Sequence, residues 1–436
     1  MIKVLKIILT VLVTDLFFFP LIMWGIPGNS KIYLAVAGLV LVAFELIRQK
    51  EMSVPRELLF LLFFSGMVSL MSLISISYNQ TEDRAYVTYI ISACVWLSSA
   101  FTVCRIIKAA FGRVDVPLVV HNLIGVCLLQ CLFTMLIAFV PSFSLFVDRY
   151  FDTGQNLMRD LDRLYGIGAL LDVAGSRFSV VLVAIAFMVA TPQRRITMGW
   201  IMFYTLSFIV ISVIGNMIAR TTTIGMLIGL AWILVGPFIA PRNNKETTVY
   251  GKGWIMLLTT GALVLISVIL YNASPDVKEF MRFGFEGFFS LVETGEWQVD
   301  SNEMLKSMVV WPEELRTWII GDGYFLNSRY DPNYLGDATD QGFYMGTDIG
   351  YLRFIFYFGL AGLVWVLAVV VYSAYVCGKS FREYAWLFVM ALSVGLAVWA
   401  KVSTDVFLFF ALFLCAAALQ ETPEESVLST EPQQTS

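Results

Sequence analysis

Residues 349–375 read IGYLRFIFYFGLAGLVWVLAVVVYSAY and carry one charged side chain, Arg353. A helix needs about 20 consecutive apolar residues to cross the hydrocarbon core of a bilayer. Only helices and closed barrels satisfy their backbone hydrogen bonds in lipid, and this run is too long for a barrel strand of about 10 residues. The stretch therefore predicts a membrane-spanning helix.

Similar apolar runs recur along the whole chain. Hydrophobic residues make up 58% of the sequence and charged residues 14%, whereas soluble domains are about 25% charged. We therefore expect an all-α polytopic membrane protein, a single bundle over residues 1–420 with about twelve transmembrane helices. The predicted spans are residues 4–24, 32–47, 58–76, 87–103, 117–140, 178–190, 198–218, 223–240, 254–271, 349–375, 384–400 and 406–419.

The loops between these spans alternate in charge. One set is consistently basic and includes Lys108 and Lys245, while the short loops of the other set hold few basic residues: Lys31, Arg84, Arg220 and Lys401. Cytoplasmic loops carry the excess of Lys and Arg. With an even number of spans, both termini are expected in the cytoplasm.

Two outer loops are much longer than the others, residues 141–177 and residues 272–347, the latter between the ninth and tenth helices. The larger loop opens with Ser274, Pro275 and Asp276, which is typical of a helix start, and apolar residues follow at helical spacing to Val292. We expect an amphipathic helix on the membrane surface, either covering the bundle or supporting a lipid substrate. Residues 421–436 have the composition of a disordered cytoplasmic tail.

Several kinds of site are disfavoured by composition. The only histidine, His121, stands alone in a predicted span, where we expect a structural role. No His/Cys cluster with metal-ligand spacing occurs, so no metal site or cofactor is predicted. The six cysteines fall in spans or at their cytoplasmic ends and do not indicate a disulfide framework.

Arginine dominates the basic residues of the outer loops, and three arginines stand at predicted outer helix ends: Arg177, Arg220 and Arg353. The planar fork of arginine binds phosphate oxygens in pairs. An arginine this close to hydrocarbon must be paired or hydrated, and such residues are candidates for function. The alternative is that each side chain simply reaches the membrane interface.

Two motifs resemble those of the bacterial O-antigen and exopolysaccharide polymerases. The string WIIGDGYF, followed by GTDIGYLRFIFYFGLAGL, resembles their C-terminal signature, and ARTTTIGMLIGL resembles their arginine followed by small hydroxyl residues. The layout of about a dozen spans, with the largest outer loop before the last helices, is also similar. The resemblance covers most of the chain.

This resemblance implies a metal-independent glycosyltransferase on the periplasmic face of a bacterial inner membrane. Its donor and acceptor would be undecaprenyl-diphosphate-linked oligosaccharide repeats. The partners would be membrane lipid and a chain-length regulator protein, with no nucleic acid. Arg177 and Arg220 would hold the diphosphate leaving group, and Asp348 would act as the general base.

Other residues near the predicted site are expected to contact substrate: Arg353, Tyr351, Asp340, Asp322 and Arg329. Asp340 and Asp322 are also weaker candidates for the base. For Asp348 a second interpretation stays open, in which its carboxylate caps the following helix.

Three alternative functions remain. The related O-antigen ligases carry a functional histidine in the large outer loop, which this sequence lacks, so a polymerase is favoured over a ligase. A lipid-linked oligosaccharide flippase or other transporter would match the number of spans, but carriers commonly have two similar halves. Charge within the predicted spans is sparse, and Asp15, in the first span, would be a packing residue or part of a transport pathway. A structural or assembly role is the third.

Overall fold

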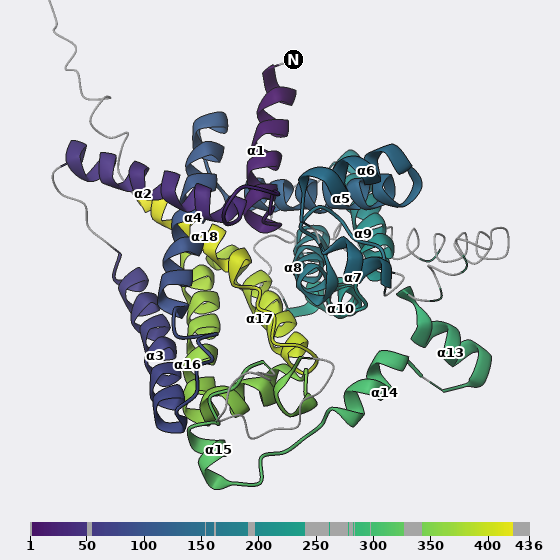
Figure 1. Ribbon diagram of the computed structural model, residues 1–436. Coiled ribbons are helices and arrows are strands. Elements are labelled where there is room, and N and C mark those ends of the chain that lie inside the picture. Colours follow the sequence, from purple (N-terminus) through teal and green to yellow (C-terminus); the bar gives the residue numbers. More distant parts are fainter. Residues whose placement is uncertain are drawn as a thin grey trace, which may run out of the picture.

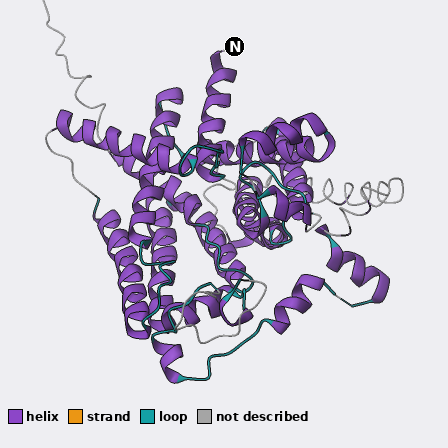
Figure 2. Ribbon diagram, viewed as in Figure 1, coloured by secondary structure: helices purple, strands orange, loops and turns teal. Residues whose placement is uncertain are grey.

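A computed structural model gives the fold of the chain. It describes residues 2–49, 55–152, 154–160, 163–190, 197–239, 261, 278, 282, 284–296, 298–326 and 342–421. Helices dominate this part of the chain, and its β-structure is limited to two isolated bridges, Met23 with Phe151 and Leu326 with Phe343 (Figure 2). The all-α prediction is confirmed.

Eight helices of the described residues are long and apolar enough to cross a membrane. They are α3 (Arg56–Asn79), α4 (Tyr89–Phe111), α5 (Val116–Phe139), α8 (Leu171–Ala190), α9 (Met198–Ile218), α10 (Thr222–Ile239), α16 (Gly350–Ser380) and α17 (Ala385–Trp399) with the turn before it. The protein is thus a multi-pass membrane protein. Three further predicted spans coincide with α1 (Ile2–Phe18), α2 (Ser30–Gln49) and α18 (Phe407–Glu421). The predicted span at residues 254–271 lies outside the described residues, apart from Gly261.

Three predicted helix boundaries are wrong by several residues, one of them the end of α4, which lies at Phe111 and not at residue 103. Helix α1 ends at Phe18 and not at residue 24, because Pro20 has no N–H to continue the helix. Helix α8 begins at Leu171, so its first turns occupy the end of the predicted outer loop at residues 141–177. That loop also contains two short helices, α6 (Pro141–Tyr150) and α7 (Gln155–Asp160).

The described part of the larger predicted loop contains three short α-helices and a 3-10 turn at Tyr344–Gly346. The α-helices are α13 (Glu286–Thr294), α14 (Asp300–Ser307) and α15 (Leu315–Ile319). Helix α13 overlaps the second half of the predicted amphipathic helix and leaves Leu291 and Val292 exposed. Figure 1 shows α13 and α14 at the edge of the bundle, whereas α15 lies against the end of α16.

Helix α8 forms the centre of the bundle because its sequence is apolar on every side, from Phe178 to Ala190. It packs on α5, α9, α10 and α17. Its closest neighbour is α10, where a Cβ on Gly225 would lie 2.2 Å from the Cα of Ser179. Only glycine permits this approach, which fixes the outer end of α10 against that of α8.

Helix α16 is kinked at Phe358 and Gly359, where Gly359 has a φ of +68°. The WIIGDGYF motif packs into this kink. The backbone N–H of Asp322 donates to the carbonyl of Phe356 (2.6 Å), and that of Gly323 donates to the carbonyl of Tyr357 (3.1 Å). The motif therefore supplies the hydrogen bonds that the kink removes from the helix.

Asp15 makes a contact between helices. Its Oδ1 accepts a hydrogen bond from Nε2 of Gln130 on α5 (2.8 Å), and the same nitrogen donates to the carbonyl of Ile167 (2.9 Å). These contacts join α1 to α5 and to the segment before α8, as expected if Asp15 is a packing residue.

The helix ends fall into two groups, and the contacts given below join ends of the same group. Ends predicted to be cytoplasmic meet through Lys6 and the Ala110 carbonyl, Lys379 and Glu57, and Gln420 and the Val114 carbonyl. Ends predicted to be outside meet through Asn79 and the Gly321 carbonyl, Tyr357 and the Asp83 carbonyl, and Lys401 and Asp172.

Candidate functional site

The connection between α17 and α18, residues 400–406, brings together the outer ends of helices far apart in sequence. Nζ of Lys401 lies 3.0 Å from Oδ1 of Asp172, in the first turn of α8. The hydroxyl of Thr221, just before α10, donates to the same oxygen. The side chains of Asp172 and Lys401 are 19% and 23% exposed, so this ion pair is shielded but not sealed from solvent.

A second ion pair lies at the start of α16. Nη1 of Arg353 is 3.1 Å from Oδ1 of Asp348 and 3.1 Å from the hydroxyl of Ser403, and Nη2 donates to the carbonyl of Phe325 (3.2 Å). Its guanidinium carbon lies 3.8 Å from the ring centroid of Phe325. Arg353 is therefore held by protein groups and is itself the residue that orients Asp348.

Asp348 does not cap α16. The N-cap position is Ile349, and no side-chain capping bond is formed, so the capping interpretation is wrong. Burial raises the pKa of Asp348 from its ordinary value of 3.8 to about 6. The positive charge of Arg353 opposes this rise, and the charge of Asp172 adds to it. A carboxyl with this pKa is well suited to accept a proton near neutral pH.

Arg220 lies in the short connection between α9 and α10 and pairs with the outer loop. Its Nη1 is 2.7 Å from Oε2 of Glu286, the first residue of α13. Burial lowers the pKa of Arg220, and the charge of Glu286 opposes that shift. The side chain nevertheless stays cationic, as arginines do.

Arg177 lies on α8, two turns into the helix, and is half-buried. Its guanidinium carbon lies 5.8 Å from the ring centroid of Phe18 and 5.5 Å from that of Phe19, at the end of α1. Among the described residues, no ion pair joins it to a carboxylate. The two rings lie beside this cation, and the charge of Asp405, in the connection before α18, also acts on it.

Two predicted substrate-binding residues are engaged in packing contacts. The hydroxyl of Tyr351 donates to the carbonyl of Leu396 on α17 (2.8 Å). Asp322 is buried and accepts hydrogen bonds from Thr317 (2.7 Å) and Tyr344 (3.3 Å), with Arg316 at 3.3 Å. The remaining two, Asp340 and Arg329, lie outside the described residues.

The sequence analysis missed three residues of this region as candidates, namely Asp172, Lys401 and Glu286. Each stands in an outer segment beside a helix end, but their partners lie 229 residues away for Asp172 and Lys401, and in a separate loop for Glu286. The signal in the sequence is charge beside a predicted outer helix end, which acidic residues and lysines provide as well as arginines.

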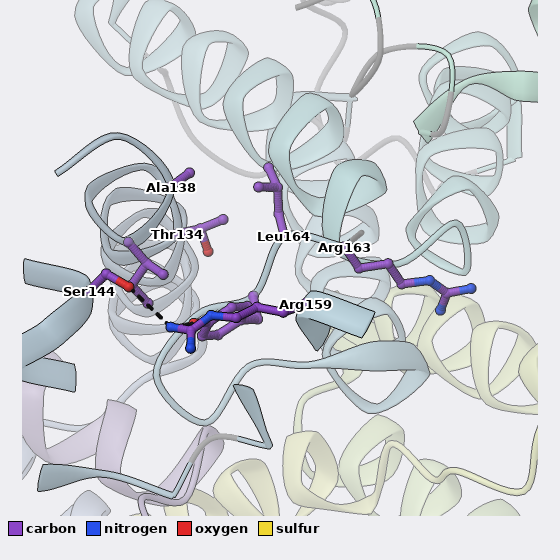
Figure 3. Close-up of a pocket in the computed structure, with 8 residues that line it drawn as sticks. Thr134, Ala138, Ser144, Arg159, Arg163 and Leu164 are labelled. Carbon is purple, nitrogen blue, oxygen red and sulfur yellow. Dashed lines mark hydrogen bonds between the residues drawn. The ribbon is translucent and has the colours of Figure 1, made fainter. Parts of the chain in front are cut away.

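A cavity of about 160 Å³ lies nearby, between α5, α6 and the segment after α7. Its lining includes Thr134, Ser144, Tyr165 and Arg159, and Arg159 is bound to Asp148 (2.5 Å). Arg163 stands at the rim and extends away from the other lining residues (Figure 3). None of the predicted site residues lines this cavity.

Among the described residues, no three His, Cys, Asp or Glu side chains lie together in an arrangement that could hold a metal ion. His121 instead stacks on Trp200, with ring centroids 4.5 Å apart, and its Nε2 is 2.7 Å from the hydroxyl of Tyr204. These are packing contacts of α5 and α9.

Comparison with known proteins gives no further guide to the family. No protein family model, curated protein or solved structure matches this chain. The function must therefore be argued from the residues and their geometry.

Proposed function

We propose that the protein is a polysaccharide polymerase that joins undecaprenyl-diphosphate-linked oligosaccharide repeats by metal-independent glycosyl transfer. The proposal includes twelve membrane spans, cytoplasmic termini, and a site on the periplasmic face of a bacterial inner membrane. Its main support is Arg177, a half-buried cation beside two neighbouring aromatic rings with no ion-pair partner among the described residues. The motif resemblance described above points to the same chemistry.

In this reaction the hydroxyl of the acceptor sugar attacks the anomeric carbon of the donor. The bond between that carbon and the diphosphate oxygen breaks, and the electron pair leaves with the lipid diphosphate. Arg177 and Arg220 would stabilise this developing negative charge at the lipid boundary. The proton of the attacking hydroxyl would pass to Asp348, which Arg353 holds in place.

The first test is the surface polysaccharide of a strain that lacks the gene, separated on a gel. Deletion of a polymerase leaves one repeat unit attached to the surface lipid that normally carries the long chain. Deletion of a ligase or a flippase leaves no repeat unit on that surface lipid. A strain with no attached repeat, or with normal long chains, would contradict the proposal.

The same strain then tests Arg177. Complementation with Arg177→Ala should give chain growth about 10²- to 10³-fold slower, as expected when a donor to the leaving group is removed. Arg177→Lys should restore activity only in part, because an ammonium group cannot replace a bidentate fork. Arg220→Ala is expected to behave in the same way.

A matched control is Arg149→Ala. Arg149 is also an outer arginine beside an aromatic ring, 5.6 Å from the centroid of Tyr150, but it is exposed at the surface of α6. This variant should support normal chain length. If Arg177→Ala does so too, at equal protein levels, Arg177 does not bind the leaving group.

A further inference from the structure

The ion pair between Arg220 and Glu286 conflicts with a role for Arg220 in binding phosphate. The carboxylate of Glu286 lies 2.7 Å from the guanidinium, in the position that a phosphate oxygen would take. Both side chains are mostly shielded, with 17% and 24% of their surface exposed. A lipid diphosphate can therefore reach Arg220 fully only when Glu286 moves away.

The position of Glu286 in the chain allows it to move together with α13. It begins α13, a helix of nine residues, and its other oxygen, Oε1, accepts the backbone N–H of Asp300 at the start of α14 (3.1 Å). The two short helices lie at the edge of the bundle (Figure 1). Short helices at the periphery of a domain open at a smaller free-energy cost than its central helices.

Arg220, in contrast, is on a fixed support. Its neighbour Thr221 donates to Asp172, and Thr223 donates to Oδ1 of Asn216 (2.6 Å). The close contact of α10 with α8 holds the same connection. Separation of the ion pair would therefore move α13 and leave Arg220 in place.

The contact surface of α13 is suited to reversible docking. Gly284, two residues before Glu286, lies so close to the end of α9 that a Cβ would be 3.3 Å from the Asn216 carbonyl carbon. On α13 itself, Phe288, Leu291 and Val292 are 38%, 46% and 87% exposed. Among the described residues, the contacts of this segment with α9 and α10 are concentrated around Gly284 and Glu286.

We propose that α13 is a lid whose Glu286 carboxylate occupies Arg220 until a lipid diphosphate displaces it. This inference rests on the proposed function, because it assigns a regulation to the same site. A ligand shifts such an equilibrium by its difference in affinity for the two states. The diphosphate carries more negative charge than the single carboxylate, so it favours the open state.

Binding of undecaprenyl diphosphate to the purified full-length protein in detergent tests the lid. Glu286→Gln keeps the shape of the side chain and removes the competing charge, so we expect three- to tenfold tighter binding. The control is Glu293→Gln on the same helix, which removes an ion pair of 2.6 Å with Arg282 in which both side chains are about half exposed. That variant should bind like the wild type.

A double-variant cycle separates the lid from an indirect effect. If Glu286 acts through Arg220, then Glu286→Gln should not tighten binding when Arg220 is already alanine. Equal tightening in both backgrounds, or none in the wild-type background, would overturn the lid. If Arg220→Ala binds undecaprenyl diphosphate more weakly and Glu286→Gln binds it like the wild type, the lid is overturned but the proposed function is not. Absence of diphosphate binding in every variant would overturn the proposed function as well.

A measurement on the wild-type protein covers the case in which Glu286→Gln does not fold. Hydrogen exchange of the amides in α13 should become faster when undecaprenyl diphosphate is added, because the helix leaves its docking surface. Exchange in the central helix α8 should stay unchanged. Protection of α13 that stays the same or increases would show that the lid does not open.

Discussion

Arg353 shows why contacts matter more than residue type in assigning a role. Its guanidinium donates to Asp348, Ser403 and the carbonyl of Phe325, and it lies between the rings of Phe325 and Phe343. With 6% of its surface exposed, it has little contact with solvent. Arg177 offers the opposite case, since aromatic rings hold it but no carboxylate of the described residues pairs with it. Arg353 thus orients Asp348, whereas Arg177 is the residue that we propose to bind the leaving group.

Asp348→Asn tests the general base. We expect polymerisation to slow by roughly 10²- to 10⁴-fold at pH 7, because asparagine cannot accept the proton. In the wild type, activity should rise with pH up to about 6, the pKa of Asp348, and then level off. The residual activity of the variant should not show this rise. The measurement is the rate of chain growth by purified protein on lipid-linked repeats.

The stability of the protein provides a second pH readout for the same residue. The folded-state pKa of Asp348 lies above its ordinary value, so between about pH 4 and 6 the folded protein binds more protons than the unfolded one. The contribution of this carboxyl to stability therefore falls as the pH rises through that window. Asp348→Asn should remove this component. Normal chain length and an unchanged pH profile in the variant would exclude Asp348 as the base.

The candidate site could be predicted from the sequence only in part. Charge beside a helix end identified Arg177, Arg220 and Asp348, because a polar group next to a long apolar run is visible in one dimension. The Asp172–Lys401 pair could not be identified in this way, since the pattern within a helix does not say which helix ends meet. The same limit applies to Tyr351, whose hydroxyl contacts α17.

At the level of elements, the kink of α16 explains the WIIGDGYF motif. The long apolar run predicts a helix over residues 349–375 but not its interruption, because Gly359 is also tolerated within a straight helix. In the structure, a Cβ on Gly359 would lie 2.2 Å from the carbonyl carbon and oxygen of Ile319, at the end of α15. The kink and the motif therefore form one structural unit.

Gly359→Ala should destabilise this unit. The φ of +68° is strained for alanine, and the added methyl group would overlap the backbone of Ile319. We expect a loss of at least about 2 kcal/mol in the free energy of unfolding. The measurement is the thermal unfolding temperature in detergent, followed by size-exclusion chromatography.

The control for this substitution is Gly378→Ala in the same helix. There a Cβ would meet Ala385 at 3.7 Å, an ordinary contact, so alanine should be neutral or slightly stabilising through its helix propensity. Equal unfolding temperatures for the two variants would mean that the kink does not depend on glycine.

For the whole molecule, the grouping of helix ends supports the arrangement expected from loop charge. The loop-charge pattern treats each loop separately, whereas the contacts link them in space. Lys379 pairs with Glu57 at one face, and Lys401 pairs with Asp172 at the other. Each pair joins loops that the charge pattern assigns to the same side. Which face is cytoplasmic depends on the charge pattern alone.

Reporter fusions along the chain test this orientation. We expect Asn302 and Tyr334 to be outside, and Lys108, Lys245 and the C-terminus to be in the cytoplasm, because the basic loops are retained there.

The comparison of Lys245 with Asn302 is the most informative. Only one predicted span, residues 254–271, separates these two positions, and it lies outside the described residues apart from Gly261. Opposite signals at the two positions would establish that this segment crosses the membrane. Cytoplasmic signals at both would remove that span, place Asp348 in the cytoplasm with Lys245, and contradict the proposed function.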